Sequence, residues 1–217
     1  MNDEGVVERR GGDEEEIRLP AYEKRAYQPV FGNPNGTLSG FREDYYLAAR
    51  ATTQRIAEGK TLGETEGIAA LFLFRHYLEL ALKSIIFGLR RLETRRKNMP
   101  RAERVQQASG HNLGALWAEI KKDYPLNMGQ KDWNGLDTAF LDECICEFDR
   151  IDPSSERFRY PLEKKRPSRD RLKPLAVAWE RLPDTIEHAW DVLEMMDTYL
   201  METYAQNEEW EAEMNSW

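Results

Sequence analysis

A helix-like run from Ile68 to Arg90 is apolar around most of its circumference, yet it contains five ionisable residues. These are Arg75, His76, Glu79, Lys83 and Arg90. At about 100° per residue they fall on one stripe roughly 100° wide. Burying such groups without partners costs several kcal/mol each, so the stripe must pair internally, face a cleft or meet another subunit. The run therefore predicts a long helix with a polar seam, which is the strongest clue to a functional site.

The spacing of apolar residues, with Gly and Pro as breaks, predicts an all-α fold. We expect helices at about 41–58, 64–94, 113–123, 133–151 and from Pro183 onward, with Pro125 ending the third. Prolines make 158–179 irregular, and Leu175–Trp179 is expected to be a short strand or an extended piece. The prediction is a bundle of about five helices (residues 41–205) with a long irregular basic loop before the last helix. A weakly structured leader (1–40) precedes it, and an acidic tail (206–217) follows.

Charge and cysteine content point to a cytoplasmic protein. Charged residues from Arg75 to Lys83 interrupt the longest apolar run, so no membrane span is expected, and the acidic N-terminus has no apolar signal segment. Cys144 and Cys146 would point about 200° apart on a helix, which rules out a bridge between them. Because no second ligand pair exists, we expect no metal site, and no motif indicates a cofactor.

The net charge of −8 is unevenly distributed. Residues 90–104 carry seven basic and two acidic side chains, and residues 157–173 carry eight basic and two acidic ones. These basic segments are either solvated loops or parts of a local phosphate site on an acidic body.

Three segments in order resemble the HEPN superfamily of small helical proteins. They are Phe74-Arg75-His76-Tyr77-Leu78-Glu79-Leu80-Ala81-Leu82-Lys83, then Gly110-His111-Asn112-Leu113, then Ile151-Asp152 with Phe158-Arg159-Tyr160-Pro161. The resemblance covers roughly residues 65–200. It implies an all-α bundle that forms a symmetric homodimer. It also implies one of two roles: a metal-independent endoribonuclease of toxin–antitoxin, abortive-infection or CRISPR-linked defence, or a non-catalytic module.

Catalytic members of that superfamily carry an Arg-x(4–6)-His motif. In that chemistry histidine transfers the 2′-hydroxyl proton and arginine stabilises the charge that develops on phosphorus. Two segments match the spacing, Arg181-x6-His188 and Arg104-x6-His111. Arg181 is followed by Leu182 and Pro183, where the family often has a polar residue after the arginine.

The polar seam has a functional and a structural interpretation. In the functional one, the seam forms a polar cleft to which later segments contribute His111 and Arg159. There Arg75, Lys83 and Arg159 bind phosphate, Tyr160 stacks on a base, and one of His76, His111 or His188 transfers a proton. In the structural one, Glu79 is the centre of a buried polar network that fixes helix register, with His111 capping the third helix.

The leading hypothesis is a HEPN-like protein acting on RNA, an endoribonuclease of a bacterial defence or toxin system. The alternative is a non-catalytic HEPN-like module that binds a nucleotide or a protein partner, such as an antitoxin or another defence component. An unrelated helical adaptor is the third.

Overall fold

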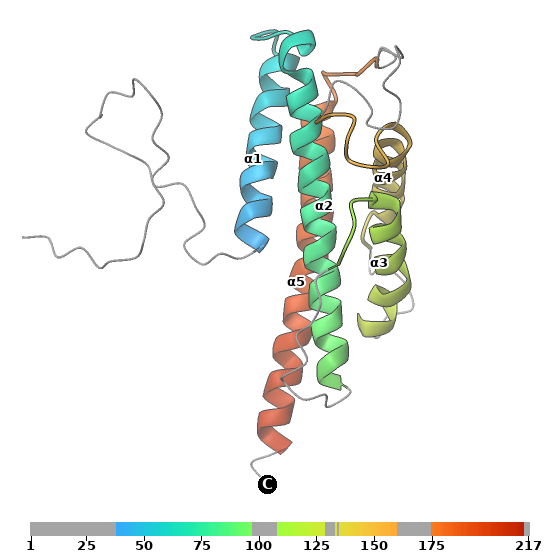
Figure 1. The fold of residues 1–217 in the computed structure, drawn as a ribbon. Helices are drawn as coiled ribbons and strands as arrows, with labels where there is room; N and C mark the ends of the chain where they lie inside the picture. The colour runs from blue at the N-terminus through green and yellow to red at the C-terminus, as the bar shows by residue number, and fades with distance from the viewer. Residues whose placement is uncertain (1–37, 97–107, 129–132, 134, 160–174, 215–217) are drawn as a thin grey trace, which may run out of the picture. The chain divides into compact units, whose positions relative to one another are not determined.

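The computed structural model describes residues 38–96, 108–128, 133, 135–159 and 175–214. Within these ranges it contains no β-strand and the following α-helices: α1 (Leu38–Ala57), α2 (Gly63–Arg96), α3 (Leu113–Met128), α4 (Thr138–Ile151) and α5 (Leu182–Met214) (Figure 1). The predicted all-α bundle of about five helices is therefore confirmed for the part of the chain that is described. Residues 1–37 of the predicted leader and 160–174 of the basic loop lie outside it.

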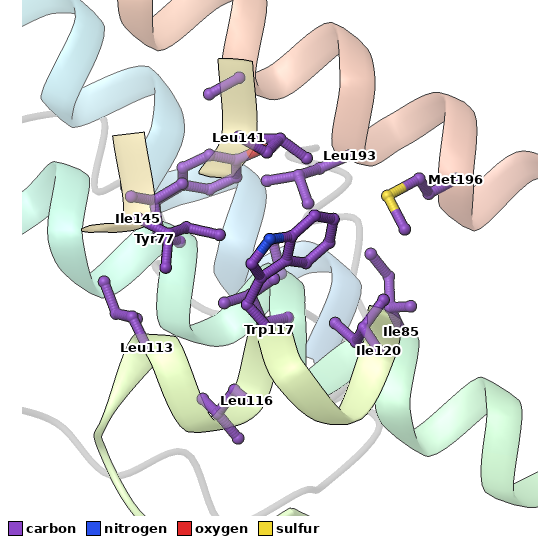
Figure 2. Packing of buried hydrophobic residues seen from close by; sticks show 14 of the residues in the cluster. Tyr77, Ile85, Leu113, Leu116, Trp117, Ile120, Leu141, Ile145, Leu193 and Met196 are labelled. Carbon is purple, nitrogen blue, oxygen red and sulfur yellow. The ribbon is translucent and has the colours of Figure 1, made fainter. Parts of the chain in front are cut away.

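Helix α2 is the central element of the bundle. It packs against α1, α3 and α5, while α4 packs against α3 and α5. Burial of apolar side chains drives this packing, and Trp117 of α3 illustrates it (Figure 2). Its ring lies among side chains of three other helices, including Ile85, Leu141 and Leu193. None of the helices in the described ranges is both long and apolar enough to cross a membrane.

A buried arginine ties α1 to α5. The Nη2 atom of Arg42 lies 2.5 Å from Oε1 of Glu194 and 2.9 Å from Oδ2 of Asp197. Burial raises the pKa of the Glu194 carboxyl, and the charge of Arg42 only partly opposes this effect. Arg42 was not among the charged residues that the sequence singled out, because it lies outside the long apolar run.

Helix α3 does not end before Pro125 as predicted, but continues through it to Met128. The prediction was wrong because tertiary contacts hold the preceding residue in the helix. The hydroxyl of Tyr124 donates a hydrogen bond to the carbonyl oxygen of Met196 at 3.0 Å, and its ring stacks against Trp133. These contacts outweigh the restriction that a proline places on the residue before it.

Helix α4 begins at Thr138, five residues later than predicted. The Asp137 side chain accepts a hydrogen bond from the backbone N–H of Phe140 at 3.1 Å, which marks Asp137 as the N-cap. Gly135 has φ of +80°, so the turn before the cap breaks the helix. Residues 175–178 form no strand, and α5 starts at Leu182, one residue before Pro183.

Glycine allows α2 and α5 to approach closely. A Cβ atom on Gly88 would lie 2.2 Å from Cδ2 of Leu200, which is buried and has little room to move. Gly67 makes a similar contact with the Trp179 ring, where a Cβ atom would lie 2.6 Å away. Position 88 therefore needs glycine for packing, although glycine is a poor helix former.

Gly88→Ala is expected to destabilise the protein by about 1–3 kcal/mol, because overpacking exceeds the gain in helix propensity. Chemical denaturation monitored by circular dichroism measures the change. Leu200→Ala removes the clashing methyl groups, so adding Gly88→Ala to that variant should cost much less than it does in the wild type. If Gly88→Ala destabilised both backgrounds equally, the contact with Leu200 would not be the reason that position 88 requires glycine.

Candidate functional site

Three members of the polar seam, Arg75, Glu79 and Lys83, pair with one another, while Arg90 pairs with Glu119 of α3. Arg75 and Glu79 are only 1% and 2% exposed, and Nη1 of Arg75 donates to Oε2 of Glu79 at 3.3 Å. One turn further on, Nζ of Lys83 donates to Oε1 of Glu79 at 2.8 Å, and Lys83 is 18% exposed. The spacing of four residues places all three side chains on one face, as the sequence predicted. The seam therefore runs from a buried cation to one that solvent reaches.

Arg75 joins three separate segments of the chain. Its Nη2 atom donates to the backbone carbonyl oxygen of His111 at 2.6 Å, and its Nε atom donates to that of Asp152 at 3.2 Å. The carboxylate of Asp152 lies 3.4 Å from the same Nε. Because the guanidinium is enclosed by these partners and by Glu79, it holds the segments together and is not positioned to contact a ligand.

The segment before α3 is held by Asn112. Its side-chain oxygen accepts from the backbone N–H of Ala115 at 2.6 Å, and its amide nitrogen donates to Asp149 at 2.7 Å. Asn112 is thus the residue that caps α3, which corrects the expectation that His111 does so. The cap uses no atom of the His111 ring.

His111 is an exposed imidazole bound to a buried carboxylate. Its ring is 58% exposed, and Nδ1 lies 2.8 Å from Oε1 of Glu79, the same oxygen that binds Lys83. Burial acts to raise the pKa of Glu79, but hydrogen bonds and charge from Lys83 and His111 lower it below its ordinary value of 4.5. A carboxylate only accepts hydrogen bonds, so Nδ1 carries the proton and Nε2 of the neutral ring has a free lone pair.

The segment that follows α4 is folded by Asp152. Oδ1 of Asp152 accepts from the backbone N–H groups of Glu156 and Arg157 at 2.8 and 3.0 Å. Phe158 is buried directly afterwards, and the exposed Arg159 follows it. Arg75 therefore anchors the turn that leads to Arg159.

His76 lies beside this network without joining its hydrogen bonds. Its ring is flanked by Tyr45 and Phe72, with centroids 4.4 and 5.6 Å away. Burial lowers the pKa of His76, as do the nearby cations Lys83, Arg159 and Arg75, while Glu79 acts in the opposite direction. We therefore expect His76 to be uncharged at neutral pH.

His188 belongs to a different place. Its Nε2 atom lies 3.0 Å from Oδ2 of Asp137, at a surface hollow of about 220 Å³ between the start of α4 and α5. Arg181 is exposed just before α5, and no interaction among the described residues joins it to His188. In place of Arg181, a carboxylate holds this histidine. The other spacing match begins at Arg104, which lies outside the described residues, as does Tyr160.

The structure thus brings together Arg75, Glu79, Lys83 and His111, with His76 and Arg159 close enough to act electrostatically. Sequence reasoning missed the bridging role of Asp152, the cap at Asn112 and the pairing of Asp137 with His188. Asn112 directly before Leu113 and Asp137 directly before Thr138 were the available capping signals. Within the described ranges, no group of three or more His, Cys, Asp or Glu side chains is arranged to hold a metal ion.

Glu79→Gln is expected to lower the free energy of unfolding by about 3–5 kcal/mol at neutral pH, because it removes one of the two carboxylates that pair with the buried Arg75 and leaves Lys83 without its partner. The pKa of Glu79 lies below 4.5 in the folded protein. Its contribution to stability is therefore complete above the unfolded pKa and is lost as the pH falls through the folded pKa. Urea denaturation at several pH values should show wild type and variant converging in acid.

Glu187→Gln is the matched control, because Glu187 and its partner Arg50 are both about half exposed. No measurable change in stability is expected there. If Glu79→Gln also left stability unchanged, the buried network would not stabilise the fold.

Comparison with known proteins returned no protein-family model, no curated protein and no solved structure that matches this chain. The HEPN resemblance therefore stays a prediction from the quoted residues.

Proposed function

We propose that this chain is a HEPN-like protein acting on RNA, an endoribonuclease of a bacterial defence or toxin system that works without a metal ion and uses His111 for proton transfer. The observation that carries this proposal is the exposed His111 ring bound through Nδ1 to the buried Glu79. RNA cleavage of this kind needs a base that removes the 2′-hydroxyl proton. In this proposal Nε2 of His111, the ring nitrogen that Glu79 does not bind, performs that task.

The charges around His111 suit a phosphodiester. Lys83 donates to the Glu79 oxygen that also binds His111, and it is partly exposed. Arg159 is exposed on the segment that Arg75 anchors. A cation near the reacting phosphate stabilises the negative charge of the transition state. In this proposal Lys83 and Arg159 supply that charge, and Arg75 keeps them and His111 in register. His76 and His188 have no part in the chemistry.

A non-catalytic module that binds a nucleotide or a protein partner is the second candidate. The burial of Arg75 favours it, because the guanidinium already binds Glu79 and the backbone carbonyls of His111 and Asp152 and so cannot stabilise a transition state. In that case the same cations would bind a phosphate group without cleaving RNA.

The test is cleavage of single-stranded RNA and tRNA by the full chain with EDTA present. His111→Ala is expected to abolish cleavage without unfolding the protein, because the ring is exposed and Arg75 binds only the backbone of this residue. His188→Ala is the matched control, since His188 is also an exposed imidazole held by a carboxylate. It should retain activity, and so should His76→Ala.

Circular dichroism confirms that each variant is folded. Loss of cleavage only in His111→Ala would support the proposed role. Loss only in His188→Ala would move the site to the start of α5 and contradict it. Binding of RNA or a nucleotide without cleavage in the wild type would favour the non-catalytic module. Absence of both would point to a protein partner.

A further inference from the structure

The buried network is close to electrical balance when His111 is neutral. Its anions are Glu79 and Asp152, and its cations are Arg75 and Lys83, so their formal charges cancel. A proton on His111 would give this group one positive charge in excess. That charge would lie on the one ring that is mostly exposed. Protonation of His111 is therefore the step that makes the cluster attractive to an anion.

The hydrogen-bonding capacity of the ring changes at the same step. Glu79 occupies Nδ1 in either state. The Nε2 atom accepts a hydrogen bond when the ring is neutral and donates one when it is protonated. Sulfate and a phosphodiester offer only acceptors, so they can bind Nε2 only when the ring is protonated.

Lys83 lies close enough to share such a ligand. Its Nζ atom and Nδ1 of His111 are each 2.8 Å from the same Glu79 oxygen. The two nitrogens are therefore at most twice 2.8 Å, or 5.6 Å, apart. Glu79 itself is buried and is neutralised by its partners, so a ligand would meet the cations first.

We propose that Lys83 and the His111 ring form a binding site for a tetrahedral oxyanion of the sulfate or phosphate type, and that the ligand is bound together with a proton on His111. This inference rests on the site of the proposed function, but it concerns binding and can be tested without RNA cleavage. By linkage, lower pH strengthens anion binding, and the anion in turn favours the protonated ring.

Other charged groups around the ring do not supply this behaviour. On α2, Arg75 is enclosed by its partners, and His76 carries no hydrogen bond to Glu79 or Lys83. Asp149 of α4 accepts a hydrogen bond from the Asn112 side chain, and Asp152, which follows α4, accepts from two backbone N–H groups. His111 is the imidazole that is bound to Glu79 and mostly exposed, whereas burial lowers the pKa of His76 and so opposes its protonation.

Sulfate is the appropriate probe, because its charge does not change between about pH 5.5 and pH 8, where imidazoles titrate. Its binding to the full chain is followed by NMR or calorimetry at constant ionic strength. We expect wild type to bind sulfate about five- to thirtyfold more tightly at the lower pH, as uptake of one proton by an imidazole allows. His111→Gln should remove this pH dependence, and Lys83→Met should weaken binding at both pH values.

His188→Gln is the matched control and should behave like the wild type. Sulfate binding that stays pH-dependent in His111→Gln would overturn the inference, and so would binding that Lys83→Met leaves intact or no binding at all. None of these results decides whether RNA is cleaved, so the proposed function stands or falls on its own assay. At the lower pH, inorganic phosphate and dithymidine phosphate, a diester without a 2′-hydroxyl, are each tested for displacement of bound sulfate. Displacement by the diester would identify a nucleic-acid backbone as the source of the oxyanion, and displacement by inorganic phosphate alone would identify a free ion.

Discussion

The structure around the candidate site depends on one constraint, which is that the guanidinium of Arg75 is buried in a largely apolar bundle. A buried cation is tolerated only when charges and hydrogen-bond acceptors surround it. Glu79 supplies the charge from the same helix, and the backbone carbonyls of His111 and Asp152 supply acceptors from two distant segments. Satisfying Arg75 therefore fixes the loop before α3 and the turn after α4 against α2.

Glu79 links this buried cation to the candidate reactive group at the surface. One of its oxygens faces Arg75, while the other binds both Lys83 and His111 at the protein surface. A carboxylate that is buried and paired on one side can orient an exposed imidazole on the other without being screened by water. The same residue thus serves the fold and the proposed chemistry, and the two roles are separable because His111 can be replaced without touching Arg75.

The second histidine–carboxylate pair shows why geometry alone does not select the site. His188 is held by Asp137, but that carboxylate is half exposed and is also used to cap α4. Water screens an exposed ion pair more strongly than a buried one. Among the residues that the structure describes, no lysine binds the carboxylate of Asp137. The pair is better explained as a link between the start of α4 and α5 than as a reactive centre.

The sequence by itself determined the helical class, the approximate positions of the helices and the charged face of α2, because these follow from periodicity within about four residues. It did not determine that α3 continues through Pro125, that Arg42 is buried against α5, or that α4 begins only after its N-cap, Asp137. Local preferences in these places are weaker than packing or cap hydrogen bonds from the folded chain. The sequence predicted that a later segment brings His111 to the charged face of α2, but only the tertiary structure showed that its ring binds Glu79, 32 residues away, and that His188 lies elsewhere. The physical reason is that Arg75 needs backbone acceptors, and their positions are decided when the helices pack.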